Sequence, residues 1–132
     1  MALQAPTQLI TVAELQDAED TARVFDCTVH LRPDPPRAYR VESGLADYKA
    51  GHIPGAAFLD LQGTLSDNNA PHRFTRLEDE ALGAAFAAEG VVDGAELVLY
   101  SSGHPMWATR VWWMLRALGV SAKVLDGGLA AW

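Results

Sequence analysis

The sequence ELVLYSSGHPMW occupies residues 96–107. Its first five residues form a mostly apolar run without the polar alternation of a strand that has one face in water, so they predict a central strand covered on both faces. Residues 101–105 then form a tight loop, and an apolar helical pattern runs from residue 106 to residue 118, before Gly119. A strand, a short loop and a helix in this order are typical of a parallel sheet with helices on both faces.

The rest of the chain repeats this alternation. Further strands are predicted at residues 8–10, 23–28, 56–61 and 122–125. Helices are predicted at residues 11–20, 45–50 and 75–90, and another helix opens at residue 129. The fold class is therefore α/β, and residues 1–132 are expected to form one domain.

Two helix starts and two loops carry specific local signals. Thr11 with Glu14, and Thr75 with Glu78, have the spacing of capping boxes. Three prolines and three arginines between residues 32 and 40 predict a surface loop that continues in neither a sheet nor a helix. Residues 62–74 predict a polar loop.

Composition excludes several classes of partner. The chain has 10 Lys and Arg against 17 Asp and Glu, a net charge of −7, which argues against nucleic acid and anionic membranes as partners. No apolar run approaches the roughly 20 residues that cross a bilayer, and residues 1–9 lack the features of a signal peptide. The single cysteine, Cys27, cannot form an internal disulfide and suits a reducing compartment. We expect a cytoplasmic protein.

The loop after the central strand is the candidate site. Ligands of open parallel sheets collect beyond the carboxyl ends of the strands, where helix N-termini favour anions. Gly103 permits a tight turn and His104 could supply a cation or a proton, whereas Pro105 removes one amide from an anion cradle. The candidate residues are Ser101, Ser102, Gly103, His104, Pro105, Met106 and Trp107. The alternative is a strand-to-helix turn without a binding role.

Two further motifs carry a resemblance to a known family. Residues 48–56 read YKAGHIPGA, which resembles the Y-x-x-G-H-I-P-G-A signature of rhodanese domains, and residues 125–132 read LDGGLAAW, which is similar to their L-x-G-G-x-x-x-W ending. Asp26 matches the acidic residue of the family at the end of the second strand. Residues 110–116, RVWWMLR, look more specifically like the N-terminal half of two-domain thiosulfate or 3-mercaptopyruvate sulfurtransferases. The resemblance implies a central five-stranded parallel sheet with helices on both faces.

One position departs from the family pattern. Active rhodanese domains carry their catalytic cysteine directly after the central strand, and here that position is Ser101. A serine hydroxyl cannot form the persulfide through which a thiolate transfers sulfur. In tandem members the first domain commonly lacks this cysteine. The resemblance therefore implies a non-catalytic first half whose partner is a second, catalytic rhodanese domain after residue 132, with no catalytic residue in this chain.

Two other functions stay open. The chain could be a stand-alone module whose loop binds an anion or a protein. It could also be an active sulfurtransferase whose native cysteine at position 101 is replaced by serine in this sequence. The encoded gene distinguishes all three, through its codon for this position and through the codons beyond residue 132.

Other chemistries lack support in the sequence. Ser101 has no G-x-S-x-G elbow, so a serine hydrolase is not favoured. Arg110 lies nine residues after Ser101, too far along the helix to serve as a phosphatase arginine. Cys27 is predicted to be a buried structural thiol, and the four histidines lack metal-ligand spacing. We expect no cofactor and no metal.

The tryptophans suggest a contact outside this domain. The helical stripe that should face the sheet comprises Trp107, Val111, Met114, Leu115 and Leu118. Trp113 lies on another face. Trp112 or Trp113 is therefore expected to pack under the loop or against a partner domain. The arginines at positions 32, 37 and 40 are expected to form a solvated face.

Overall fold

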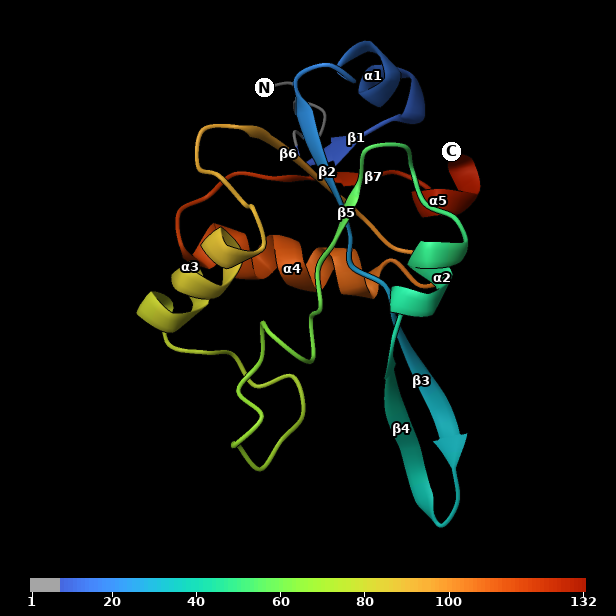
Figure 1. Cartoon of the computed structure of the whole chain (residues 1–132), viewed down its shortest axis with the longest axis vertical. Coiled ribbons are helices and arrows are strands. Elements are labelled where there is room, and N and C mark those ends of the chain that lie inside the picture. The colour runs from blue at the N-terminus through green and yellow to red at the C-terminus, as the bar shows by residue number, and fades with distance from the viewer. Residues whose placement is uncertain (1–7) are drawn as a thin grey trace, which may run out of the picture.

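The computed structural model describes residues 8–132, and the predictions for residues 1–7 lie outside this range. A five-stranded sheet in the order β1-β7-β6-β2-β5 forms its centre, and every strand pairing in it is parallel (Figure 1). The strands are β1 (Leu9–Ile10), β2 (Ala22–Asp26), β5 (Ala57–Phe58), β6 (Glu96–Tyr100) and β7 (Lys123–Leu125). The predicted central position of β6 is confirmed, since two strands lie on each side of it.

Helices cover both faces of the sheet. They are α1 (Val12–Asp17), α2 (Leu45–Ala50), α3 (Asp79–Ala88), α4 (Met106–Ala117) and α5 (Gly128–Ala131). Figure 1 shows α3 and α4 together on one face. Side chains of α1 and α5 pack with the opposite face. The expected α/β fold is confirmed.

Alternation along β6 divides the core into two layers, because successive side chains of a strand point to opposite faces. Leu97 and Leu99 pack with the side chains of α3 and α4, whereas Val98 and Tyr100 pack with Leu15 of α1. All four of these β6 side chains are buried. Burial on both faces explains why this segment lacks polar alternation.

The predicted surface loop at residues 32–40 is wrong. Strands β3 (Val29–Asp34) and β4 (Arg37–Ser43) form an antiparallel hairpin there, which projects away from the main sheet (Figure 1). Pro35 and Pro36 occupy the turn, and Pro33 lies where the pairing register shifts. Prolines are compatible with strand structure at turns and irregular positions because no ladder amide is needed there.

The capping prediction is confirmed at Thr11 and wrong at Thr75. Thr11 caps α1, and its hydroxyl and backbone amide exchange hydrogen bonds with Glu14. By contrast, α3 begins after Glu78, and the hydroxyl of Thr75 donates to the carbonyl of His72 at 2.7 Å. The Thr75 carbonyl accepts from the Asp67 amide at 2.7 Å, which ties this segment to the preceding loop instead of a helical turn.

Other predicted elements were too long, and strand β2 ends at Asp26 instead of residue 28. Helix α1 ends at Asp17 instead of residue 20. Strand β5 covers only Ala57–Phe58, because the chain turns at Asp60, whose carboxylate accepts from the Gly63 amide at 3.0 Å. The turn ends the strand although Leu59 and Leu61 remain in the core.

Candidate functional site: the loop after the central strand

The loop begins at the carboxyl end of β6 and leads into α4, as the sequence predicts. Ser101 is 3% exposed, and its hydroxyl donates to the backbone carbonyl of His104 at 2.9 Å. The His104 ring instead accepts a bond from the Met106 amide through Nδ1 at 3.0 Å. The serine therefore bonds to the backbone of His104, and the imidazole accepts from the first amide of α4 instead of acting as a base for the serine.

A series of hydrogen bonds through buried polar side chains connects the loop to the end of β2. The Asp26 carboxylate accepts from the Thr28 hydroxyl at 2.5 Å and from the Thr28 amide at 2.9 Å. The Thr28 hydroxyl in turn accepts from the Ser102 amide at 2.9 Å. Asp26 and Thr28 are buried, so each of these bonds satisfies a group that water cannot reach. The acidic residue at the end of β2 thus positions the loop through Thr28.

Three positions of the loop, Ser102, Pro105 and Met106, offer no free backbone amide to an anion. The Ser102 amide is bound to Thr28, the Met106 amide is bound to His104, and Pro105 has no amide hydrogen. A phosphate or sulfate cradle needs several convergent amides. This arrangement does not favour the passive anion binding that the position in the fold suggests.

A cavity of about 390 Å³ lies between the loop and the turn from β7 into α5. Its walls include Ser101, Gly103, Pro105, Thr109, Asp126 and Gly128, together with apolar side chains. Asp126 is the one charged residue among the described residues that line this cavity. A larger cavity of about 450 Å³ lies around Glu96, at the opposite end of β6 from the loop.

The Gly127-Gly128 turn packs directly on the loop. Gly128 has a φ of +60°, and a side-chain carbon at this residue would lie 2.5 Å from the Ser101 carbonyl oxygen. The Leu129 amide also donates to this oxygen, at 3.5 Å. Only glycine combines this backbone conformation with this close approach without strain. The motif near the end of the chain therefore shapes the candidate site.

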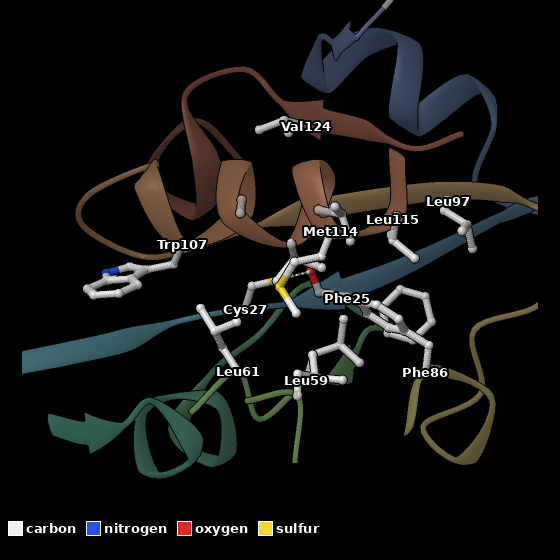
Figure 2. Close-up of a cluster of buried hydrophobic side chains, with 14 of the residues drawn as sticks. Phe25, Cys27, Leu59, Leu61, Phe86, Leu97, Trp107, Met114, Leu115 and Val124 are labelled. Carbon is white, nitrogen blue, oxygen red and sulfur yellow. Dashed lines mark hydrogen bonds between the residues drawn. The ribbon is translucent and has the colours of Figure 1, made fainter. Parts of the chain in front are cut away.

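Cys27 lies away from the loop surface. It is completely buried in the larger core cluster, and Figure 2 shows it in the middle of that cluster, beside Met114. Burial raises the pKa of its thiol well above the ordinary value, and the charge of Asp26 raises it further. The thiol is therefore protonated near neutral pH and inaccessible to a sulfur donor, as expected for a structural cysteine.

The sequence also singles out three side chains that lie outside the loop, and the structure gives the contacts of each. His52 bonds through Nδ1 to the Tyr48 carbonyl at 2.7 Å and stacks on the Tyr48 ring. Both contacts are local, so this histidine stabilises the turn in which it lies. Arg110 donates to the Phe74 carbonyl at 2.7 Å. It therefore does not contact Ser101 in the way that a phosphatase arginine contacts the loop of its active site. Trp112 donates to the Ala122 carbonyl at 2.9 Å and packs within the domain.

Sequence reasoning missed two residues of the site. The first is Thr28, which bonds to both Asp26 and Ser102. The sequence signal for this residue was an Asp followed two residues later by Thr, a spacing that favours a local bond between a side chain and the backbone. Asp126 lines the cavity beside Gly127, and in the sequence it is distinguished only by its place in the LDGG motif.

Residues 8–132 hold neither a metal cluster nor a membrane helix. No group of three or more His, Cys, Asp or Glu side chains in this range is arranged to hold a metal ion. None of the helices in the same range has the length and apolar composition of a bilayer span.

Curated relatives are sulfurtransferases. The chain is 40% identical over 87 residues to 3-mercaptopyruvate sulfurtransferase of Escherichia coli K12, covering 65% of this chain and 31% of the relative. It is 35% identical over 130 residues to the putative thiosulfate sulfurtransferase SseB of Mycobacterium tuberculosis, covering 94% and 43%. It is 36% identical to a probable 3-mercaptopyruvate sulfurtransferase of Pseudomonas aeruginosa, covering 95% and 44%. The chain thus spans less than half the length of these relatives.

Solved structures agree with the fold. SseA from Escherichia coli, described as a 3-mercaptopyruvate sulfotransferase, superposes with a TM-score of 0.82 at 31% identity, covering 96% of this chain and 47% of SseA. A human single-domain sulfurtransferase shares the fold, with a TM-score of 0.57 at 21% identity, and 96% of both chains is covered. The rhodanese-like domain family matches residues 11–132. Since the chain has both sequence motifs, a five-stranded parallel sheet and this family match, it belongs to the rhodanese-like domain family of the sulfurtransferases.

Proposed function

We propose that this chain is the non-catalytic, N-terminal rhodanese-like half of a two-domain thiosulfate or 3-mercaptopyruvate sulfurtransferase. A second rhodanese-like domain, after residue 132, supplies the cysteine that carries sulfur. The first domain supports the second by packing against it. Residues 1–132 act as one domain in this arrangement.

The observation that carries the proposal is the residue at the head of the loop. Sulfur transfer needs an accessible thiolate that attacks the donor and holds a persulfide. Ser101 occupies the position after the central strand, and its hydroxyl is bonded to the loop backbone. The one cysteine of the sequence is buried with a raised thiol pKa.

The charge of the loop cavity supports the same proposal. Thiosulfate and 3-mercaptopyruvate are anions at neutral pH, and an anion is stabilised by cations or free amides. The described lining of the cavity carries a single charged residue, the acidic Asp126, and two of the loop amides are already bound. This environment disfavours an anionic sulfur donor.

The lengths of the relatives support a second domain. The matched region covers 31% to 44% of three curated sulfurtransferases and 47% of the SseA structure. More than half of each of these proteins therefore lies outside the part that resembles this chain.

The second candidate is a stand-alone module that binds an anion or a protein through its loop, and one observation favours the single-domain arrangement that it requires. The human single-domain sulfurtransferase and this chain cover 96% of one another, so the fold also occurs as a single domain. The gene decides between the candidates. A second domain with a cysteine after its central strand supports our proposal, whereas a stop codon near residue 132 supports the module.

The main test is sulfur transfer from thiosulfate or 3-mercaptopyruvate to cyanide. The 132-residue chain is expected to give no turnover above background and no persulfide by mass spectrometry. Cys27→Ala is the control for a contribution from the buried thiol. Turnover that survives this substitution would defeat the proposal.

The third candidate, a native cysteine at position 101, has its own test. The gene either encodes serine or cysteine there. If it encodes cysteine, Ser101→Cys restores the native residue, and sulfur transfer by that variant would overturn the non-catalytic assignment. In the whole gene product our proposal instead expects Ser101→Ala to keep activity, while removal of the second-domain cysteine abolishes it.

We also propose a cytoplasmic location. The single cysteine of this sequence cannot form an internal disulfide, which suits a reducing compartment. Fractionation of cells that express the native gene, followed by immunoblotting, tests this assignment. Recovery of the protein in an extracellular or periplasmic fraction would contradict it.

A further inference from the structure

Helix α4 presents an apolar and cationic stripe to the outside. Met106, Arg110 and Trp113 are four and three residues apart, so they lie on one face of the helix. Met106 is 39% exposed and Trp113 is 46% exposed, although both are large apolar side chains. The other large exposed apolar side chains each lie on a different segment of the described chain: Leu9, Leu31, Tyr39, Leu45 and Val92. Among the described helices and strands, α4 alone combines two of them with a cation at helical spacing.

Arg110 is fixed in place without a carboxylate. One guanidinium nitrogen donates to the Phe74 carbonyl at 2.7 Å, and the guanidinium lies 4.8 Å over the Trp113 ring. Its Nε atom is buried and has no hydrogen-bond partner in the described chain. Within residues 8–132 no acidic side chain forms an ion pair with Arg110.

A second arginine adds positive charge nearby. Arg76 donates to the Leu77 carbonyl at 3.1 Å and pairs with Asp79 at 2.5 Å, yet its Nε is also buried without a partner in this part of the protein. Burial lowers the pKa of Arg110, and the neighbouring charge of Arg76 lowers it further. Of these two guanidinium groups, only that of Arg76 has a carboxylate partner, which leaves a local excess of positive charge on a protein whose net charge is −7.

We propose that the α4 face, defined as Met106, Arg110 and Trp113 with Arg76 beside them, is the surface on which the second rhodanese-like domain packs. That domain presents a carboxylate to Arg110 and an apolar hollow to Trp113. This inference rests on the proposed function, which supplies the second domain. Tryptophan and arginine are the residue types that most often dominate the binding energy of interfaces, particularly where an aromatic anchor is buried on association.

A domain in the same polypeptide is the occupant that the observations favour. The relatives are more than twice as long as the matched region, so a covalently joined domain is at hand. A linked partner has a high effective concentration, and a modest contact area then suffices. A carboxylate from that domain would neutralise the excess positive charge, which no described acidic residue does.

The test compares surface labelling of two polypeptides, the 132-residue chain and the whole gene product with its second domain. Hydroxyl-radical labelling read by mass spectrometry reports the exposure of each side chain. Labelling of Met106 and Trp113 is expected to fall at least fivefold in the whole product. Val92 is 49% exposed and lies outside the proposed surface, so its labelling should stay the same.

A pair of variants in the whole product sharpens the test. Trp113→Ala should increase labelling of Met106 at least threefold, because the anchor of the interface is removed. The matched control, Val92→Ala, should leave Met106 protected. Circular dichroism and a urea unfolding curve verify that each variant is folded, and the labelling of the unsubstituted proteins stands independently of both variants.

Three results would refute the proposal that the second domain packs on the α4 face. Equal labelling of Trp113 in both polypeptides, in a product that transfers sulfur through its second domain, upholds the proposed function and refutes the surface. Protection that depends on the concentration of the 132-residue chain assigns the face to a second copy. A gene without a second domain removes the proposed function and this inference together.

Discussion

Gly128→Ala should destabilise the domain more than an ordinary glycine substitution. A left-handed backbone conformation costs a residue with a side chain about 1–2 kcal/mol, and Gly128 has a φ of +60°. The new carbon would also meet the Ser101 carbonyl oxygen at 2.5 Å, so the backbone must shift. Overpacking of this kind costs about 1–3 kcal/mol. The loss in free energy of unfolding should therefore be about 2–5 kcal/mol.

Gly55→Ala is the matched control for this change. Gly55 has a φ of +82°, but a side-chain carbon there meets nothing within 4 Å. Its substitution should cost only the conformational part, about 1–2 kcal/mol. The two variants should then differ by about 1–3 kcal/mol, or on the order of 1 M in the midpoint of urea unfolding.

Tryptophan fluorescence and far-ultraviolet circular dichroism, recorded during urea titration of the three proteins, measure this difference. Both signals should give the same midpoint for each protein if unfolding is two-state. If Gly128→Ala is no less stable than Gly55→Ala, the close packing of the Gly127-Gly128 turn on Ser101 does not constrain this loop, and the reasoning fails.

Two further substitutions test the buried groups behind the loop. Because the thiol pKa of Cys27 is raised by burial, the folded state keeps a proton that the unfolded state releases above about pH 8.5. The free energy of unfolding should therefore fall by about 1.4 kcal/mol between pH 7 and pH 9.5 because of this thiol. In Cys27→Ala, the free energy of unfolding should not show this contribution to its decrease with pH. Equal pH dependence of both proteins in urea unfolding would contradict the raised pKa. Thr28→Val removes the hydroxyl that joins Asp26 to Ser102 and should cost about 2–4 kcal/mol in the same assay. The exposed Thr21 donates to a backbone carbonyl at 3.2 Å, and its valine variant should lose under about 1 kcal/mol; similar losses for both threonines would refute the role of Thr28.

Local sequence signals predicted the centre of the fold well. The apolar run at residues 96–100 identified the central strand, because burial on both faces removes polar alternation. The capping box at Thr11 identified the start of α1, since both of its hydrogen bonds lie within four consecutive residues. The motif at residues 48–56 identified the family, which the match over residues 11–132 confirms.

The same kind of signal was wrong where residues outside the short motif decide the local conformation. The capping spacing at Thr75 had no effect, because the Asp67 amide holds the Thr75 carbonyl outside the helix. Prolines near residue 33 predicted a loop, but pairing of Leu31 with Val41 forms a hairpin that places the prolines at its turn and its irregular point. In both cases a backbone contact with a residue eight or ten positions away outweighed the local preference.

Sequence alone determined the α/β class, the place of the loop at the end of the central strand, and the hydroxyl at position 101, because these depend on residue type and short-range pattern. Tertiary structure decided how the loop is held. The bond from Ser102 to Thr28 spans 74 residues, and the bond from Arg110 to Phe74 spans 36. Such contacts depend on the path of the whole chain, and no periodicity or spacing encodes them.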